Sequence, residues 1–181
     1  MSAPERVRLH DASVRLDSMP AAGRDVAVSP SAEERAAIAA QLGVTSVDAL
    51  EVKLHAVKFR GGIRVTGRLT GEVTQPSVVT LEPLHQQIAE PIDRIFLPGG
   101  EKEYAGSANA EIFVDLEGDD VPDHFDGNEA DLSELIVETL ALAVDLYPRE
   151  PNASLEDVGY KPDVDDTSPF AALSALKPKE N

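Results

Sequence analysis

The clearest pattern in the chain is a two-residue alternation of hydrophobic and polar side chains on both sides of a glycine pair. The hydrophobic positions are Leu50, Val52, Leu54 and Ala56 before the pair and Ile63, Val65, Leu69 and Val73 after it. Alternation on both sides of Gly61 and Gly62 predicts a β-hairpin with one buried face. Gly67 and Gly71 fall on that face, where they indicate a bulge, a bend or the close approach of another element.

Weaker patterns predict further strands on either side of the hairpin. Residues 1–28 contain one or two short strands interrupted at residues 19–23, and later strands are predicted over Val78–Leu81, His85–Leu97 and Glu111–Leu116. Pro91 indicates an edge or bulged position, because proline cannot donate a hydrogen bond to a ladder. Residues 117–129 are predicted to form an acidic loop.

Two segments have the spacing of amphipathic helices. The first is Ala32–Leu42, where Ser31 and Glu34 have the spacing of a capping box and Gly43 can end the helix. The second starts at Asp131, with Glu134 three residues later, and stops before Pro148. Its hydrophobic stripe consists of Leu132, Leu135, Ile136, Leu140, Ala143 and Val144. Together the elements predict an α+β fold, a mainly antiparallel sheet of about five strands with two packed helices.

The last thirty or so residues differ from the rest in composition. Residues 150–166 are acidic, poor in large hydrophobic side chains and interrupted by prolines, which is typical of a flexible linker. We therefore predict one α+β domain over residues 1–149, and an acidic linker with a short amphipathic terminal segment over 150–181. That terminal segment either folds back onto the sheet or docks on a partner.

Composition excludes several classes of site. The 181 residues include no cysteine, which excludes disulfides, Cys-ligated zinc and a thiol nucleophile, and which fits a reducing compartment. No hydrophobic run reaches the roughly 18 residues of a membrane span, and the first twenty residues contain no secretory h-region. We expect a soluble, cytoplasmic protein without a membrane partner.

Charge is distributed unevenly along the chain. The net charge is −17, and residues 98–181 account for −16 of it, with 5 basic and 21 acidic side chains. An acidic half of this kind is either a solvated surface or a face that attracts a basic partner. Extensive contact with nucleic acid phosphates would need the opposite sign.

Motifs for catalysis are weak. There is no G-x-S-x-G elbow and no phosphate-binding glycine loop, and the four histidines lie far apart in the sequence. The acids between Asp119 and Asn128 match no register of a calcium-binding EF-hand loop. We expect no catalytic residue, no metal ligand and no cofactor. The alternative is a metal-dependent hydrolase that uses the acids of the Asp119–Glu134 segment.

The predicted hairpin concentrates the positive charge of the first half. Its cationic residues are Lys53, Lys58, Arg60, Arg64 and Arg68, and His55 and Thr66 share the predicted outer face. The simplest interpretation is a charged, solvated face on which lysine discourages edge pairing. The functional alternative is a local patch for RNA phosphates or an acidic protein. Phe59 is the one aromatic residue there, which argues against reading of single-stranded bases.

Three ordered segments carry a family resemblance. They are Gly67–Leu84, which includes Gln75, Val79, Thr80, Leu81, Glu82 and Pro83; Asp131 to Arg149, ending in Tyr147-Pro148-Arg149; and Ser168–Lys177, which includes Pro169, Phe170, Leu173 and Leu176. They resemble the YceD family, also called domain of unknown function 177, whose members are described as large ribosomal RNA subunit accumulation proteins. Ser77 departs from the family pattern, because it stands where cysteine is usual, and the C-x-x-C pairs of some members are absent.

The resemblance implies a role in the processing or accumulation of large-subunit (23S) ribosomal RNA, without a known enzymatic reaction. The implied partners are a ribosomal protein, an assembly factor or pre-ribosomal RNA. The charge distribution suggests that the acidic half captures a basic protein while the hairpin faces RNA. A third interpretation is an acidic protein-binding chaperone that does not touch RNA.

Overall fold

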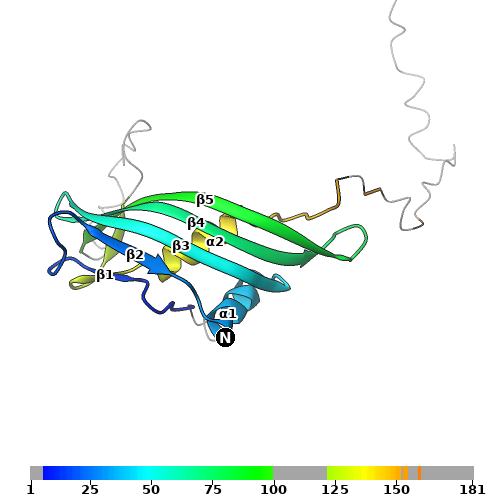
Figure 1. Ribbon diagram of the computed structural model, residues 1–181, viewed down its shortest axis with the longest axis horizontal. Helices are drawn as coiled ribbons and strands as arrows, with labels where there is room; N and C mark the ends of the chain where they lie inside the picture. Colours follow the sequence, from blue (N-terminus) through cyan, green and yellow to red (C-terminus); the bar gives the residue numbers. More distant parts are fainter. Residues whose placement is uncertain (1–5, 100–121, 152, 155–158, 160–181) are drawn as a thin grey trace, which may run out of the picture.

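A five-stranded sheet with both helices on one side forms the body of the molecule (Figure 1). The computed structural model describes residues 6–99, 122–151, 153, 154 and 159. The elements are β1 (Ser13–Arg15), β2 (Arg24–Val28), α1 (Ala32–Leu42), β3 (Ser46–Phe59), β4 (Gly62–Pro76), β5 (Pro83–Pro98), β6 (Asp123–Phe125), β7 (Glu129–Asp131) and α2 (Ser133–Ala143). The large sheet has the order β2-β3-β4-β5-β6 and is antiparallel except between β5 and β6, while β1 and β7 pair separately. The predicted α+β class is therefore confirmed.

The predicted hairpin is the pair β3–β4. Its strands pair from Phe59 and Gly62 to Ser46 and Thr74, with a bulge between Val47 and Ala49. The connecting residues Arg60 and Gly61 have φ values of 50° and 82°, as a tight two-residue hairpin turn requires. Hydrophobic residues of both strands point to the covered face, where Val52, Val65 and Leu69 are fully buried.

Gly67 shows why a glycine interrupts the hydrophobic series of β4. A Cβ atom at this position would lie 2.1 Å from the carbonyl oxygen of Lys53 and 2.8 Å from the Cα of Leu54. Gly71 is less crowded, with the nearest atom, the carbonyl oxygen of Ala49, at 3.1 Å. The close approach of another element, one of the three possibilities that the sequence left open, therefore occurs at Gly67.

The strand predicted over Val78–Leu81 is wrong. These residues form the turn between β4 and β5. The reason is local hydrogen bonding: the Ser77 backbone N–H donates to the Glu82 carbonyl and the Leu81 N–H donates to the Ser77 carbonyl, which closes a loop. Apolar β-branched residues favour a strand only when a neighbouring strand is available to pair with them.

β5 is continuous through Pro91, which lies opposite Arg68 of β4. On its other side β5 pairs with β6 only over residues 96–98. Within the described part of the chain, Pro91 therefore faces no ladder partner on that side. The predicted edge position of this proline is confirmed.

α1 forms with the predicted bounds and cap. The Glu34 N–H donates to the Ser31 hydroxyl and the Ser31 N–H donates to the Glu34 carboxylate, while Gly43 ends the helix with a φ of 71°. The Glu34 carboxylate also accepts from the backbone N–H of His10, at 2.6 Å. The hydrogen bonds from His10 and Ser31 lower the pKa of Glu34. The cap therefore fastens the N-terminal segment to α1.

α2 begins two residues later than predicted, and it has no capping box. Asp131 is the last residue of β7, where it lies opposite Ser13, and its carboxylate accepts from the Ser133 N–H. Glu134 forms an ion pair with Arg6 in place of a cap. Pairing of β7 with β1 thus overrides the local helix signal. The predicted loop over residues 117–129 is also wrong in its described part, which contains β6 and the first residue of β7.

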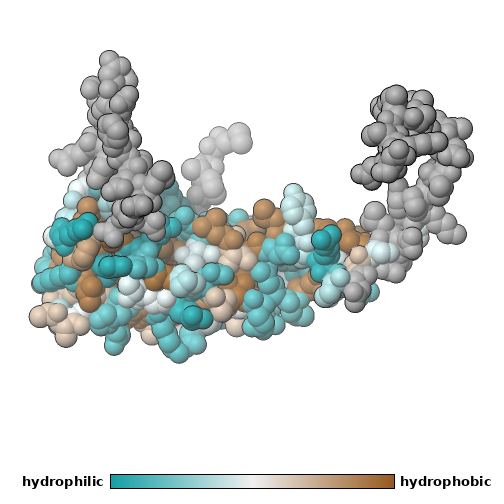
Figure 2. Space-filling model, turned by 90° about the horizontal axis from the view of Figure 1, so that it is seen from above, coloured by the Kyte–Doolittle hydropathy of each residue, from teal (hydrophilic) through white to brown (hydrophobic). Residues whose placement is uncertain are grey.

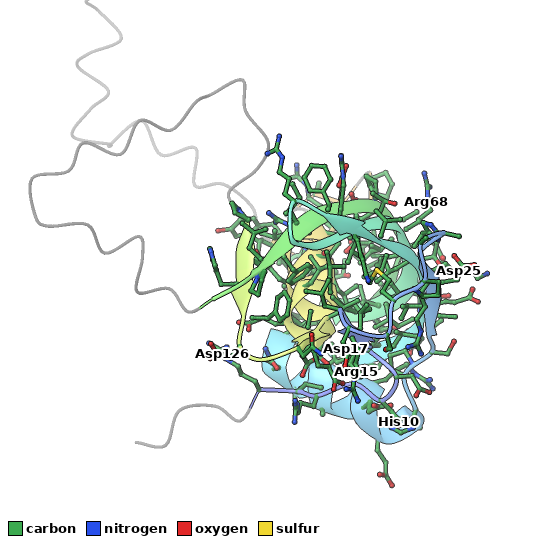
Figure 3. All side chains as sticks on the ribbon, turned by 90° about the vertical axis from the view of Figure 1, so that its left-hand side faces the viewer. His10, Arg15, Asp17, Asp25, Arg68 and Asp126 are labelled. Carbon is green, nitrogen blue, oxygen red and sulfur yellow. The ribbon has the colours of Figure 1, made fainter. Side chains whose placement is uncertain are left out.

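The core lies between the covered face of the sheet and the layer of α1, α2 and the β1–β7 pair. The predicted stripe of α2 is confirmed, with Leu132, Ile136 and Leu140 fully buried and Ala143 and Val144 packed at its margin. In Figures 1 and 3 both helices lie on the same side of the sheet, so the opposite face is open among the described residues. None of the described helices is long and apolar enough to cross a membrane.

Candidate functional site

The outer face of the β3–β4 hairpin holds part of the predicted cationic patch. Lys53 and Arg68 lie opposite each other across the two strands. The Lys53 ammonium lies 3.1 Å from the Glu51 carboxylate, whereas Arg68 forms no ion pair with any other residue that the structure describes. Figure 3 shows Arg68 on the side of the sheet opposite α1. This pair thus places two positive charges side by side on the outer face.

Arg60 and Arg64 lie nearer the hairpin turn, around one aromatic ring. Their guanidinium carbons are 5.0 Å and 5.7 Å from the centre of the Phe59 ring, which is the distance of cation–π contacts. Arg64 also donates two hydrogen bonds to Asp93 of β5, at 2.9 Å and 2.7 Å. Its hydrogen bonds lower the pKa of Asp93. The carboxylate of Asp93 therefore balances much of the charge that Arg64 brings to this face.

Lys58 does not join the other cations. It lies opposite the fully buried Ile63, so its side chain is on the covered side of the sheet and not on the outer face. Lys58 is nevertheless exposed, because it lies near the end of the strand. His55, which does lie on the outer face, contacts the Asp25 carboxylate at 2.6 Å. The structure thus brings Lys53, Arg64 and Arg68 together, with Arg60 beside the turn, and interleaves carboxylates among them.

The turn between β4 and β5 is fastened by a second group of residues. The Ser77 hydroxyl is fully buried, donates to the Glu150 carboxylate at 2.8 Å and accepts from the backbone N–H groups of Val79 and Thr80. The Thr80 hydroxyl donates to the other oxygen of Glu150, at 2.5 Å. We call Ser77, Thr80 and Glu150 the turn clamp. These hydroxyl donors lower the pKa of Glu150, with Thr80 contributing most.

Further hydrogen bonds join the same turn to the segment after α2. The Val78 N–H donates to the Pro148 carbonyl at 2.8 Å, and the Gln75 side chain donates to the Asp145 carbonyl at 3.0 Å. Gln86 of β5 bridges the end of α2, since its amide donates to the Ala143 carbonyl and accepts from the Asp145 N–H. Two segments about seventy residues apart in sequence therefore form one fixed unit.

This unit exposes large hydrophobic side chains. They are Val78 (52% exposed), Leu81 (76%), Leu146 (79%) and Tyr147 (73%), which we call the turn-end patch. Figure 2 shows hydrophobic side chains at the surface toward the right-hand end of the molecule, where the β4–β5 turn lies in Figure 1. The polar side chains of the unit are thus directed into hydrogen bonds while its apolar ones face solvent.

Comparison with known proteins places these segments in a family. Residues 65–177 match the model of the family described as large ribosomal RNA subunit accumulation protein YceD. The chain belongs to the YceD family. No curated protein and no solved structure matches the chain. The matched region includes most of β4, all of β5 and α2, and every residue of the turn clamp, and the resemblance deduced from the sequence is confirmed.

The YceD motif residues act mainly through the turn. Gln75 and Thr80 hold it by the hydrogen bonds described above, the Glu82 carbonyl accepts from the Ser77 N–H, and Pro83 begins β5. Ser77, which stands in place of the usual cysteine, is a hydrogen-bond centre of the clamp. Sequence reasoning missed Glu150, which it assigned to the linker. Its position directly after Tyr147-Pro148-Arg149 was the available signal.

A second polar cluster lies outside the clamp, on the parts of β3, β4 and β5 that are near the β4–β5 turn. Asp48, Glu72 and His85 place one ligand-type atom each within 4.8 Å of one another. The Thr74 hydroxyl donates to Asp48 and contacts His85 Nδ1 at 2.9 Å, and its bond to Asp48 is the main cause of the lowered pKa of that carboxyl. These contacts join β3, β4 and β5 through a hydroxyl-centred network.

The acidic segment that suggested a hydrolase is described from residue 122 onward. Asp131 lies 3.0 Å from Arg8, and Glu134 lies 2.8 Å from Arg6. Burial raises the pKa of Asp131, but hydrogen bonds from Ser133 and Arg8 outweigh it and lower the pKa overall. Both carboxylates are thus engaged in ion pairs with arginines. Asp119, Asp120, the predicted strand Glu111–Leu116 and the terminal residues Pro169, Phe170, Leu173 and Leu176 lie outside the described residues.

Proposed function

We propose that this protein is a non-catalytic ribosome-biogenesis factor that supports accumulation of large-subunit (23S) ribosomal RNA. It acts by binding a ribosomal protein, an assembly factor or the ribosomal RNA itself. The membership of the YceD family supports the biological role. The mode of action rests on the geometry of the family-motif segments.

One observation carries the binding role. The hydroxyl groups of Ser77 and Thr80, in the motif segment, both donate hydrogen bonds to the Glu150 carboxylate. The hydrophobic side chains of Val78 and Leu81, in the same turn, are exposed to solvent. Aliphatic side chains cannot transfer protons or attack a substrate, but they supply the contact area of a protein interface. A motif built in this way favours recognition over catalysis.

The charges favour a protein as the main partner. Residues 98–181 carry a net charge of −16, and this field would oppose close approach of a polyanion. On the hairpin, Arg64 is matched by Asp93 and Lys53 by Glu51. These ion pairs support a limited RNA contact, which we place at Arg68 and the neighbouring Lys53 of the outer face.

The proposal is tested by depletion and complementation. Removing the protein is expected to lower the ratio of mature 23S to 16S ribosomal RNA, and the wild-type chain is expected to restore it. An unchanged ratio, together with unchanged large-subunit precursors in sucrose gradients, would contradict the proposed function. The non-catalytic role is checked by melting the protein with calcium, magnesium or manganese, because a metal-dependent hydrolase would be stabilised by its ion.

A further inference from the structure

We propose that the turn-end patch is the docking surface for a cationic protein segment that also carries hydrophobic side chains. The inference rests on the proposed function and specifies its partner. Val78, Leu81, Leu146 and Tyr147 form the hydrophobic part of the surface, and the acidic groups around them supply the charge.

The surface is held in place before any partner arrives. The turn clamp fixes the loop that carries Val78 and Leu81, and the bond from Val78 to Pro148 fixes that loop against the residues next to Tyr147. Tyr147 is also held by its own N–H, which donates to the Asp145 carboxylate at 2.9 Å. A fixed backbone lowers the entropy lost on binding, which is a common property of docking surfaces.

Leu81 is the most informative member of the patch. Its φ of 63° is in the left-handed region, which is unfavourable for a bulky residue, and its side chain is 76% exposed. Nothing in the described part of the chain packs around it closely enough to explain a leucine here. Backbone strain combined with an exposed hydrophobic side chain is expected where the residue serves an interface.

The acidic residues next to the turn-end patch favour a positively charged partner. Glu82, Asp145 and Glu150 are neighbours of the patch residues in the chain, and among the described residues of these two segments Arg149 is the one cation. A segment rich in lysine or arginine complements this charge, whereas the phosphates of RNA would be repelled.

The experiment introduces a photo-crosslinking amino acid, p-benzoylphenylalanine, at position 81 of the full-length chain. The probes are the RNA-free total protein of purified large ribosomal subunits and, separately, the intact subunits. A second chain with the same amino acid at the exposed Ala40 of α1 is the control. Crosslinked peptides are identified by mass spectrometry.

We expect position 81, but not position 40, to crosslink to one defined peptide with a net positive charge. Three outcomes would overturn the inference: equal crosslinking at both positions, crosslinking of position 81 to ribosomal RNA, or crosslinking only to residues 168–177 of the same chain. The last result would mean that the terminal segment of this chain occupies the surface.

Matched variants then measure the contribution of the patch. Leu81→Ser combined with Tyr147→Ser is expected to weaken binding of the identified peptide about tenfold or more, because tyrosine is a frequent anchor of interfaces and Leu81 would lose the burial of its apolar side chain. Leu142→Ser is the control, since Leu142 is also 76% exposed but lines a separate groove beside β5. Both variants alter solvent-facing side chains, so their melting temperatures are expected to match the wild type.

The two proposals fail in different ways. If depletion lowers 23S ribosomal RNA and the double variant complements as well as Leu142→Ser, the docking inference is wrong and the proposed function stands. If depletion has no effect on ribosomal RNA, the proposed function is wrong whatever position 81 crosslinks to.

Discussion

Individual residues of the turn clamp have roles that their side-chain chemistry explains. Ser77 is small enough to be fully buried beside the turn and polar enough to satisfy two backbone N–H groups and one carboxylate. No buried side-chain polar atom in the described residues lacks a hydrogen-bond partner, so removal of this hydroxyl would create unsatisfied groups. At the position where cysteine is usual in the family, this chain therefore has a hydroxyl that holds the turn by hydrogen bonds.

Ser77→Ala should lower the free energy of unfolding by about 1–3 kcal/mol, because the half-buried N–H groups of Val79 and Thr80 lose their acceptor and Glu150 loses a donor. The measurement is urea denaturation followed by circular dichroism. Ser18→Ala, at an exposed loop position, is the control and should change stability by less than about 0.5 kcal/mol. Equal stability of the two variants would show that the hydroxyl does not hold the turn.

Glu150 predicts a pH dependence of stability. Its folded-state pKa lies below the ordinary value of 4.5 because the Thr80 and Ser77 hydroxyls bond the charged form. A depressed pKa contributes stability above the unfolded-state value, and this contribution is lost as pH falls through the folded-state value. Wild type should therefore be more stable than Glu150→Gln at pH 7, and the difference should shrink below about pH 4. A difference that stays constant with pH would contradict the role of the charged carboxylate.

At the scale of elements, local pattern predicted those parts whose partners are near in sequence. The β3–β4 hairpin and α1 formed as expected, because alternation, a two-residue turn and a capping box are local signals. The Val78–Leu81 strand was wrong because hydrogen bonds between Ser77 and residues 81–82 close a turn there, and Glu150 then holds that turn from a distant part of the chain. The start of α2 was wrong because Asp131 pairs with Ser13, which only the folded chain brings near. The periodicity of hydrophobic residues indicates which face of a strand is buried, but it does not indicate which segment pairs with that strand.

The crowding at Gly67 predicts a graded effect of adding one methyl group. Gly67→Ala should destabilise the protein by more than about 2 kcal/mol, because its Cβ would overlap the Lys53 carbonyl and force β3 and β4 apart. Gly71→Ala is the matched variant and should cost clearly less, since its nearest neighbour is 3.1 Å away. Thermal unfolding of both variants checks the order, and the reverse order would contradict the strand spacing described here.

The whole molecule combines a sheet of mixed charge with a strongly acidic second half. Only part of the outer-face charge on the hairpin is available, because Asp93 and Glu51 lie against Arg64 and Lys53. The sequence identified the cations, but it could not identify the carboxylate neighbour of Arg64, which is Asp93 of β5, twenty-nine residues away. Extended contact of this face with RNA phosphates is therefore disfavoured.

RNA binding by the isolated protein should be weak and only mildly dependent on salt. If Lys53 and Arg68 provide the phosphate contacts, the slope of log K against log salt concentration should be roughly −1 to −2 for single-stranded RNA. Lys53→Glu combined with Arg68→Glu should abolish that affinity, while Lys58→Glu, on the other face, should leave most of it. Filter binding with a 23S fragment measures this, and a slope steeper than about −4 would show that many more cations take part.

The sequence by itself determined the α+β class, the hairpin and its buried face, the first helix and the family, because each depends on patterns within a short stretch of chain. The tertiary structure decided which side chains meet: Ser77 and Thr80 with Glu150, and Arg64 with Asp93. These contacts join residues separated by dozens of positions, and their geometry depends on strand register and on where the chain leaves α2. The proposed docking surface depends on that register too, since the exposed Leu81 and Tyr147 lie on the two segments that these contacts join.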